Sequence, residues 1–114
     1  MKKLKLVINN ERKKQKNIFF VKKEMQTILN LYGEMVSKGE WKDYGLTLGP
    51  REISFDFYLN SSDRPIFKIL KNFNPRDKNE KFLIKDRNGS ILKKNESLSA
   101  LIKKANWSKL KTVV

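Results

Sequence analysis

The spacing of the apolar residues changes along this 114-residue chain from a helical period to an alternating one. From Lys22 to Lys38, apolar side chains recur at three- and four-residue intervals, which predicts an amphipathic helix of about four to five turns. Gly39 stands where a glycine usually ends a helix, and Lys38 suits the negative end of the helix dipole. Gly33 lies inside this helix at a cost of about 1 kcal/mol relative to alanine, so we expect it to allow the close approach of a neighbouring element.

From Leu46 to Leu59 the apolar residues occupy every second position, as in strands with one buried face. Turn residues, such as Gly49-Pro50 and Asn88-Gly89, separate these stretches. The five expected strands cover residues 46–48, 53–59, 66–71, 82–86 and 90–94. A short last helix is expected from Leu98 to Ala105, with Ser97 as its cap.

This order of elements predicts an α+β fold, in which a long N-terminal helix and a short C-terminal helix cover one face of an antiparallel sheet of about five strands. The length fits a single domain. Residues 9–17 contain no apolar side chain. We therefore expect residues 1–17 to form a mobile basic arm and residues 18–114 to form a single α+β domain.

The chain contains neither cysteine nor histidine. A disulfide, a thiolate metal site and a cysteine nucleophile are therefore excluded, and the commonest general base is missing. The acidic residues considered for a carboxylate pair or a divalent-ion site are Glu34, Glu40, Asp43, Glu52 and Asp56. Their spacing matches no metal loop, and the glycines form no phosphate-binding motif. We expect a protein that is not an enzyme and that uses no metal or cofactor.

The longest apolar stretches, residues 4–8 and 18–21, are far shorter than the roughly 20 residues needed to cross a bilayer. The N-terminus starts with lysines, as a secretory signal does, but its apolar part stops at Asn9-Asn10 and no cleavage site of small residues follows. We therefore expect a cytoplasmic protein without a transmembrane segment.

The charge is strongly positive, because 26 Lys and Arg residues stand against 12 Asp and Glu residues, a net charge of +14. Residues 1–23 and residues 71–114 each carry a net charge of +8, whereas residues 24–70 carry −2. A polyanionic partner would relieve the resulting self-repulsion. The leading hypothesis is therefore weak, phosphate-directed binding of nucleic acid. Base readout is not indicated, because it favours arginine and lysines outnumber arginines 21 to 5.

The cations of the fourth and fifth strands are expected to form a basic strip. A hairpin with a two-residue type I′ turn at Asn88-Gly89 places Lys85 opposite Leu92. In this register Ile91 faces the core, whereas Leu92 and four cations share the other face. The candidate nucleic-acid-binding residues are Lys81, Lys85, Arg87 and Lys94 of this strip, Lys13, Lys14 and Lys16 of the arm, and Lys103 and Lys104 of the last helix. Such a strip is also typical of a solvated face whose edge lysines discourage aggregation.

Three aromatic residues near the end of the long helix are candidates for contact with a partner: Tyr32, Trp41 and Tyr44. Trp and Tyr often anchor interfaces or stack on bases. The alternative is that they close the core where the helix meets the sheet, since both residue types suit half-buried positions.

The 17-residue run from Ile28 to Tyr44 resembles an alphaproteobacterial family known as domain of unknown function 2794. The shared features are Leu-Tyr-Gly at residues 31–33, Met-Val at 35–36, Gly-x-Trp at 39–41 and Asp-Tyr at 43–44. The resemblance extends over roughly residues 19–103, and it departs at Val21, where the family usually has a polar helix-capping residue. The family has no assigned activity, so the resemblance implies no catalytic residue, cofactor or substrate.

Two other functions stay open at this point. One is protein–protein interaction with an acidic protein or homodimerisation, through the open face of the sheet or the region of Trp41. The other is attraction of the arm to anionic lipid, which the poor amphipathic spacing of residues 4–8 disfavours.

Overall fold

The computed structural model describes residues 19–60 and 64–107. Its elements are α3 (Lys22–Ser37), β1 (Asp43–Leu48), β2 (Glu52–Tyr58), β3 (Phe67–Asn72), the 3₁₀ turn η2 (Lys78–Glu80), β4 (Phe82–Asp86), β5 (Ile91–Asn95) and α4 (Leu98–Lys104). The five strands form one antiparallel sheet in the order β1-β2-β3-β4-β5. The predicted α+β fold, with its long first helix and short last helix, is confirmed. The predicted arm, residues 1–17, lies outside the described residues.

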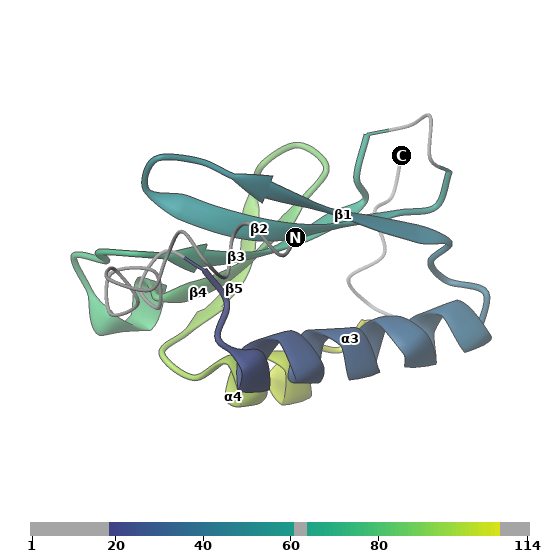
Figure 1. Cartoon of the computed structure of the whole chain (residues 1–114), viewed down its shortest axis with the longest axis horizontal. Helices are drawn as coiled ribbons and strands as arrows, with labels where there is room; N and C mark the ends of the chain where they lie inside the picture. The colour runs from purple at the N-terminus through teal and green to yellow at the C-terminus, as the bar shows by residue number, and fades with distance from the viewer. Residues whose placement is uncertain (1–18, 61–63, 108–114) are drawn as a thin grey trace, which may run out of the picture.

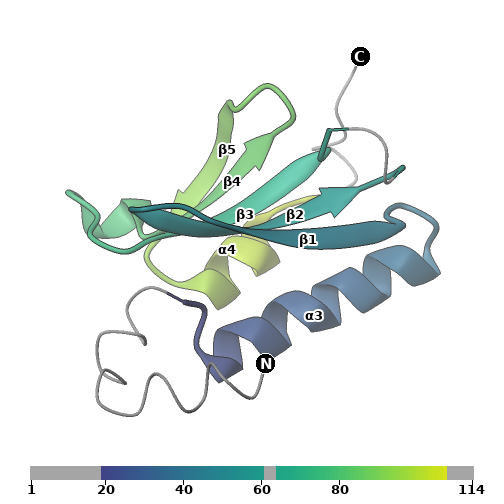
Figure 2. The same ribbon diagram turned by 45° about the horizontal axis from the view of Figure 1, so that its top comes forward.

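The alternation of side chains along the strands decides which face of the sheet is buried. Phe55 and Phe57 of β2 and Ile69 of β3 are completely buried in one cluster with Ile28 of α3 and Leu101 of α4. Both helices lie on this face of the sheet (Figures 1 and 2). No helix among the described residues covers the opposite face, which we call the open face, although Ser54, Asp56, Leu70 and Leu83 on it are also buried.

The helix α3 forms because its apolar residues line one side, where Ile28, Leu31 and Met35 are buried against the sheet. It ends at the predicted glycine. Gly39 has a φ of +76°, and the N–H of Glu40 donates to the carbonyl of Met35 at 2.9 Å. These features form a Schellman motif, which satisfies the last helical carbonyls and requires a residue that tolerates positive φ.

The expectation that Gly33 permits a close approach is wrong. Gly33 is exposed, and a Cβ added to it would meet no atom within 4 Å outside the helix's own neighbouring backbone. The helix packs through its opposite side, so this glycine makes no packing contact with the described residues of other elements.

The start of α3 is held by an ion pair instead of a polar cap. Val21 has no side-chain acceptor, and its N–H donates to Oε1 of Glu24 at 2.8 Å. The buried Lys71 of β3 donates from Nζ to the same oxygen and to the carbonyl of Phe19, both at 2.8 Å. Because these acceptors satisfy a buried ammonium group, they offset its desolvation and attach the first turn of α3 to the sheet.

The β4–β5 hairpin differs from the prediction in its turn. The N–H of Gly89 donates to the carbonyl of Asp86, and the N–H of Asp86 donates to the carbonyl of Ser90, both at 3.0 Å, so the loop has three residues. A type I′ turn needs positive φ at both central residues, but only Gly89 has one here, at +84°. The carboxylate of Asp86 favours the longer loop by accepting the N–H groups of Asn88 and Ser90 at 2.9 and 3.0 Å.

This turn changes the predicted register only next to the loop, since Leu83 pairs with Lys94 as the predicted hairpin requires. Lys85 pairs with Ile91 instead of Leu92, and a β-bulge between Ile84 and Lys85 absorbs the extra residue. As a result Ile91 is exposed on the open face, and Leu92 packs against the core. The predicted faces of these two residues are therefore exchanged.

The short helix α4 begins as predicted, because Ser97 Oγ accepts the N–H of Ala100 at 3.2 Å. Its last turn carries Lys103 and Lys104, which suit the negative end of the helix dipole. Within residues 19–60 and 64–107, neither helix has the length and apolar character that a membrane crossing requires.

Candidate nucleic-acid interface

Charge is divided unevenly across the sheet. Residues 19–60, which form α3, β1 and β2, carry five Lys or Arg against six Asp or Glu, a net charge of −1. Residues 64–107, which form β3, β4, β5 and α4, carry twelve against four, a net charge of +8. Because the strand order follows the sequence, the basic half of the described chain lies on the β5 side of the sheet.

Two residues of the predicted strip, Lys85 and Lys94, lie on the open face of neighbouring strands, where Lys94 is the register partner of Leu83. A third cation joins them, because Lys68 of β3 is the direct register partner of Lys85. We call Lys68, Lys85 and Lys94 the sheet cations. Sequence spacing missed Lys68, since the pairing of β3 with β4 crosses a long loop; its signal was a charged residue inside an apolar strand.

Two of the sheet cations have a carboxylate neighbour, Lys68 beside Asp56 and Lys94 beside Glu80. Asp56 of β2 is the register partner of Lys68 on the side away from Lys85. That carboxylate is only 3% exposed, and it accepts hydrogen bonds from Thr47 Oγ1 at 2.6 Å and Ser54 Oγ at 2.7 Å. Like charges directly opposite one another destabilise a sheet. Lys68 and Lys85 therefore form a repulsive pair.

Lys94 makes an ion pair with Glu80, with 3.6 Å between Nζ and Oε2. Both side chains are about half exposed. An ion pair this exposed contributes little to stability, about 0–1 kcal/mol, and is easily exchanged for another anion.

Two residues of the predicted strip do not join the sheet cations. Lys81 precedes β4, where its Nζ lies 5.5 Å from the ring centroid of Phe82, and it lines a hollow of about 380 Å³ with Lys71. Arg87 lies in the β4–β5 turn, and its Nε is buried without a hydrogen-bond partner among residues 19–60 and 64–107. The candidate arm residues Lys13, Lys14 and Lys16 lie outside the described residues.

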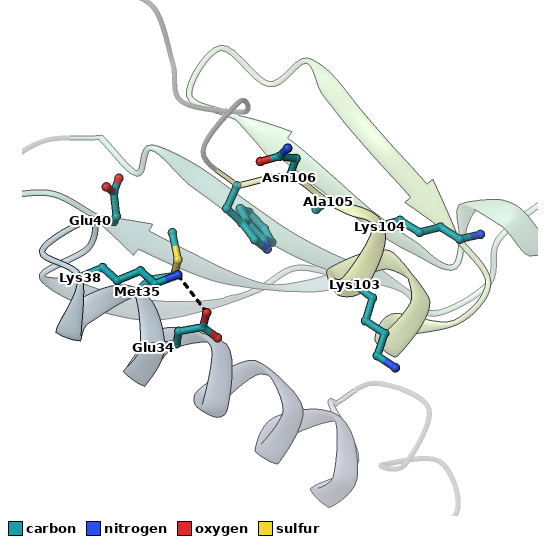
Figure 3. Close-up of a pocket in the computed structure, with 9 residues that line it drawn as sticks. Glu34, Met35, Lys38, Glu40, Lys103, Lys104, Ala105 and Asn106 are labelled. Carbon is teal, nitrogen blue, oxygen red and sulfur yellow. Dashed lines mark hydrogen bonds and ion pairs between the residues drawn. The ribbon is translucent and has the colours of Figure 1, made fainter.

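The candidates Lys103 and Lys104 lie on the helical side of the molecule, away from the sheet cations. They line a hollow of about 460 Å³ between the ends of α3 and α4 (Figure 3). Glu34 and Glu40 line the same hollow, and Glu34 makes an ion pair with Lys38 at 3.1 Å. Figure 3 shows Lys104 pointing away from the hollow. This mixture of charges does not favour a dedicated anion site.

Trp41 belongs to the core. Its side chain is 1% exposed and stacks on Phe57, with ring centroids 4.0 Å apart and planes 16° apart. Trp107 packs edge-on against it at 5.4 Å. Trp41 thus closes the core where α3 meets the sheet, which is the alternative left open by the sequence, and its ring is not presented to a partner.

Tyr32 and Tyr44 form a partly exposed pair beside this core. Their ring centroids lie 4.9 Å apart in an edge-on arrangement, and the Tyr32 hydroxyl donates to the carbonyl of Lys42 at 3.2 Å. Burial, together with the nearby Asp43 and Tyr44, raises the pKa of Tyr32. Tyr44 is 42% exposed, so it is the candidate aromatic residue best placed for contact with a partner.

A hollow of about 570 Å³, which we call the end hollow, lies where the β1–β2 turn meets the β3–β4 loop, at the left end of the sheet in Figure 1. Its lining residues are Pro50, Arg51, Asn72, Phe73, Asn74 and Arg76. Sequence analysis missed Arg51 and Arg76, because they lie far apart in the chain and only the folded sheet brings them to one end. In the sequence they stand out only by residue type, since the chain has few arginines.

The acidic residues form no metal centre in the described part of the chain, where no three His, Cys, Asp or Glu side chains gather closely enough to hold an ion. Asp56 is bound by its two hydroxyl donors, and Glu34 by Lys38.

A family model described as "Protein of unknown function (DUF2794)" matches residues 18–102. The matched region spans α3, the whole sheet and most of α4. No curated protein and no solved structure matches the chain.

Proposed function

Because the chain belongs to the family described as Protein of unknown function (DUF2794), whose description assigns no activity, we propose a function from the surface of the molecule itself. The protein is a non-enzymatic cytoplasmic module that binds nucleic acid weakly and mainly through its phosphates.

The observation that carries this proposal is the division of charge across the sheet. Solubilising charge has no reason to collect in one half, yet the described residues of β3 to α4 carry +8 and those of α3 to β2 carry −1. A surface with one dominant sign attracts polyanions and speeds their association.

The pair formed by Lys68 and Lys85 supports the same conclusion. The fold places two half-buried ammonium side chains in register on an open face, at a cost in stability. A phosphate between them would remove that cost. Lysine acts as a point charge on phosphate, which suits binding without base readout.

The proposal is tested by filter binding of duplex DNA, RNA and heparin across a range of salt concentrations. Each neutralised phosphate of duplex DNA contributes about −0.9 to the slope of log K against log salt, so five or six engaged lysines give a slope near about −5. A slope near zero contradicts the proposal.

The contribution of the sheet cations is measured with Lys68→Gln/Lys85→Gln, which should bring the slope about 2 closer to zero. Lys38→Gln/Lys42→Gln is the matched control, because it removes the same charge from exposed positions in the other half of the molecule. If both variants change the slope equally, binding depends only on the total charge and the sheet cations form no site.

The arm is tested by deleting residues 1–17. Because these residues carry many of the lysines, unchanged affinity after the deletion would assign binding to the sheet, and a large loss would assign it to the arm.

A second candidate function, interaction with another protein or with a second copy, is favoured by strand β1. Within the part of the chain that the structure describes, this edge strand pairs only with β2, and its residues Tyr44, Leu46 and Leu48 are 42%, 50% and 53% exposed. It contains no lysine, proline or bulge that would block pairing with another strand.

Size measurement over a range of concentrations and salt separates this candidate from nucleic-acid binding, because an apolar interface persists when charges are screened. Leu46→Lys/Leu48→Lys should abolish any assembly that survives high salt. A protein that stays monomeric at all concentrations and captures no partner in high salt contradicts it.

A further inference from the structure

We propose that the end hollow binds one nucleotide unit of a single-stranded nucleic acid, with the phosphate held by Arg51 and Arg76 and the base stacked on Phe73. This inference rests on the proposed function and names the subsite that grips the strand.

The fold holds the two loops of the end hollow in fixed positions. Arg51 directly precedes β2 and Phe73 directly follows β3, and the N–H of Phe73 donates to the carbonyl of Arg51 at 3.0 Å. The side chain of Asn72 donates to the carbonyl of Glu80 at 2.6 Å, which ties down the far end of the β3–β4 loop. The hollow is therefore built on the ends of paired strands, so little ordering cost arises when a ligand binds.

The electrostatics of the end hollow suit an anion. Among the described residues that line it, two are arginines and none is a carboxylate. Within residues 19–60 and 64–107, the side chains of Arg51 and Arg76 make no ion pair, so both guanidinium groups are available. A guanidinium group donates two parallel hydrogen bonds to a phosphate, which makes arginine a stronger phosphate ligand than the lysines elsewhere on the surface.

A neighbouring hollow of about 380 Å³ shares Asn72 and Phe73 with the end hollow. Its cations are Lys71, which is bound to Glu24, and Lys81, which makes no ion pair among the described residues. Lys81 is thus placed to meet the next phosphate of a strand that leaves the end hollow, which gives this predicted cation a role apart from the sheet cations.

Size and aromatic content favour a nucleotide over a bare phosphate. The end hollow has a volume of about 570 Å³, within the range of about 300–1,000 Å³ that is typical of small-molecule sites. Phe73 is half-buried and packs against the core, so its ring is held in place while it lines the hollow. A base can stack on such a ring only when it is unpaired, which favours single-stranded nucleic acid over a duplex.

The test is fluorescence polarisation with the full chain and a labelled oligothymidylate of about twelve nucleotides. Arg51→Gln/Arg76→Gln should weaken binding by about tenfold or more. The matched control, Lys103→Gln/Lys104→Gln, removes the same charge from the hollow between the helices and should stay within about twofold. All four side chains are exposed, so neither variant disturbs the core, and thermal unfolding verifies this.

Phe73→Leu tests the stacking contact while keeping an apolar side chain against the core. It should weaken binding of oligothymidylate by about fivefold and leave unchanged the binding of an abasic strand of equal length, which has the same phosphates without bases. A variant that merely perturbs the fold would weaken both.

The outcomes separate this inference from the proposed function. If the wild-type chain binds neither duplex nor single strand at low salt, both fail. If it binds and Arg51→Gln/Arg76→Gln loses no more affinity than Lys103→Gln/Lys104→Gln, the end hollow is not the site and the proposed function stands. If free thymidine monophosphate competes as strongly as the oligonucleotide, the hollow binds free nucleotides and the assignment to a strand is overturned.

Discussion

At the scale of single residues, Gly33 is a glycine inside a helix at a position where no described contact requires a glycine. It lies exposed in the interior of α3, and nothing occupies the space that a Cβ would fill. Gly33→Ala should therefore raise the free energy of unfolding by about 1 kcal/mol, because alanine restricts the unfolded chain and favours the helix. Chemical denaturation measures the change.

Gly39 is the natural control for that substitution. With a φ of +76°, it occupies the left-handed conformation that an alanine adopts only under strain. Gly39→Ala should lower the free energy of unfolding, and a loss of stability in Gly33→Ala as well would contradict the account of α3 given above.

The raised pKa of Tyr32 predicts that stability depends on pH in the alkaline range. The pKa of Tyr32 is raised in the folded protein, chiefly by burial. The folded state therefore holds the phenol proton more tightly than the unfolded chain, and this contribution to stability is complete below about pH 10 and is lost as the pH rises above it. Urea unfolding of the wild type and Tyr32→Phe between pH 7 and 11 should show a difference in stability that shrinks above about pH 10. If the stabilities of the two proteins change with pH in parallel, Tyr32 is not the source of the pH dependence.

At the scale of elements, the pairing of β3 with β4 links stability to the proposed function. Lys85→Glu would replace the repulsion between Lys68 and Lys85 by an attraction, and it should raise the free energy of unfolding by about 0.5–1 kcal/mol. The same change should weaken nucleic-acid binding, so the variant gains stability while it loses affinity.

Lys93→Glu is the control with an equal change of charge. Lys93 lies on β5 opposite Ile84, so its replacement forms no new cross-strand pair. If both variants gain the same stability, the effect comes from the total charge and not from the sheet cations.

The β4–β5 hairpin shows why a turn is harder to predict than a strand. The dipeptide Asn88-Gly89 correctly indicated a hairpin, but the residue before it, Asp86 at the end of β4, accepts two backbone N–H groups and lengthens the loop. That single side chain shifts the register by one residue, and the bulge that follows exchanges the faces of Ile91 and Leu92. Local competition between turn types thus decided which residues face the core.

At the scale of the whole molecule, a net charge of +14 opposes the compact state. Raising the ionic strength from about 10 mM to about 150 mM shortens the Debye length from about 30 Å to about 8 Å, so the melting temperature should rise. Lys103→Gln/Lys104→Gln should reduce this dependence. A melting temperature that falls with salt would show that attractive ion pairs outweigh the repulsion.

The kinds of element and their order followed from the sequence, because the period of apolar residues is a local property of each segment. A stripe at every third or fourth residue can bury one side only as a helix, and alternation only as a strand. The helix ends at Gly39 and Ser97 were also local, since a cap depends on a few neighbouring backbone groups.

Contacts between distant segments were decided only by the tertiary structure. The burial of Trp41, the pairing of Lys68 with Lys85, and the convergence of Arg51 and Arg76 all depend on which strands lie side by side and in which register. No local pattern encodes that register across a long loop, because it is set by the packing of the whole sheet under both helices.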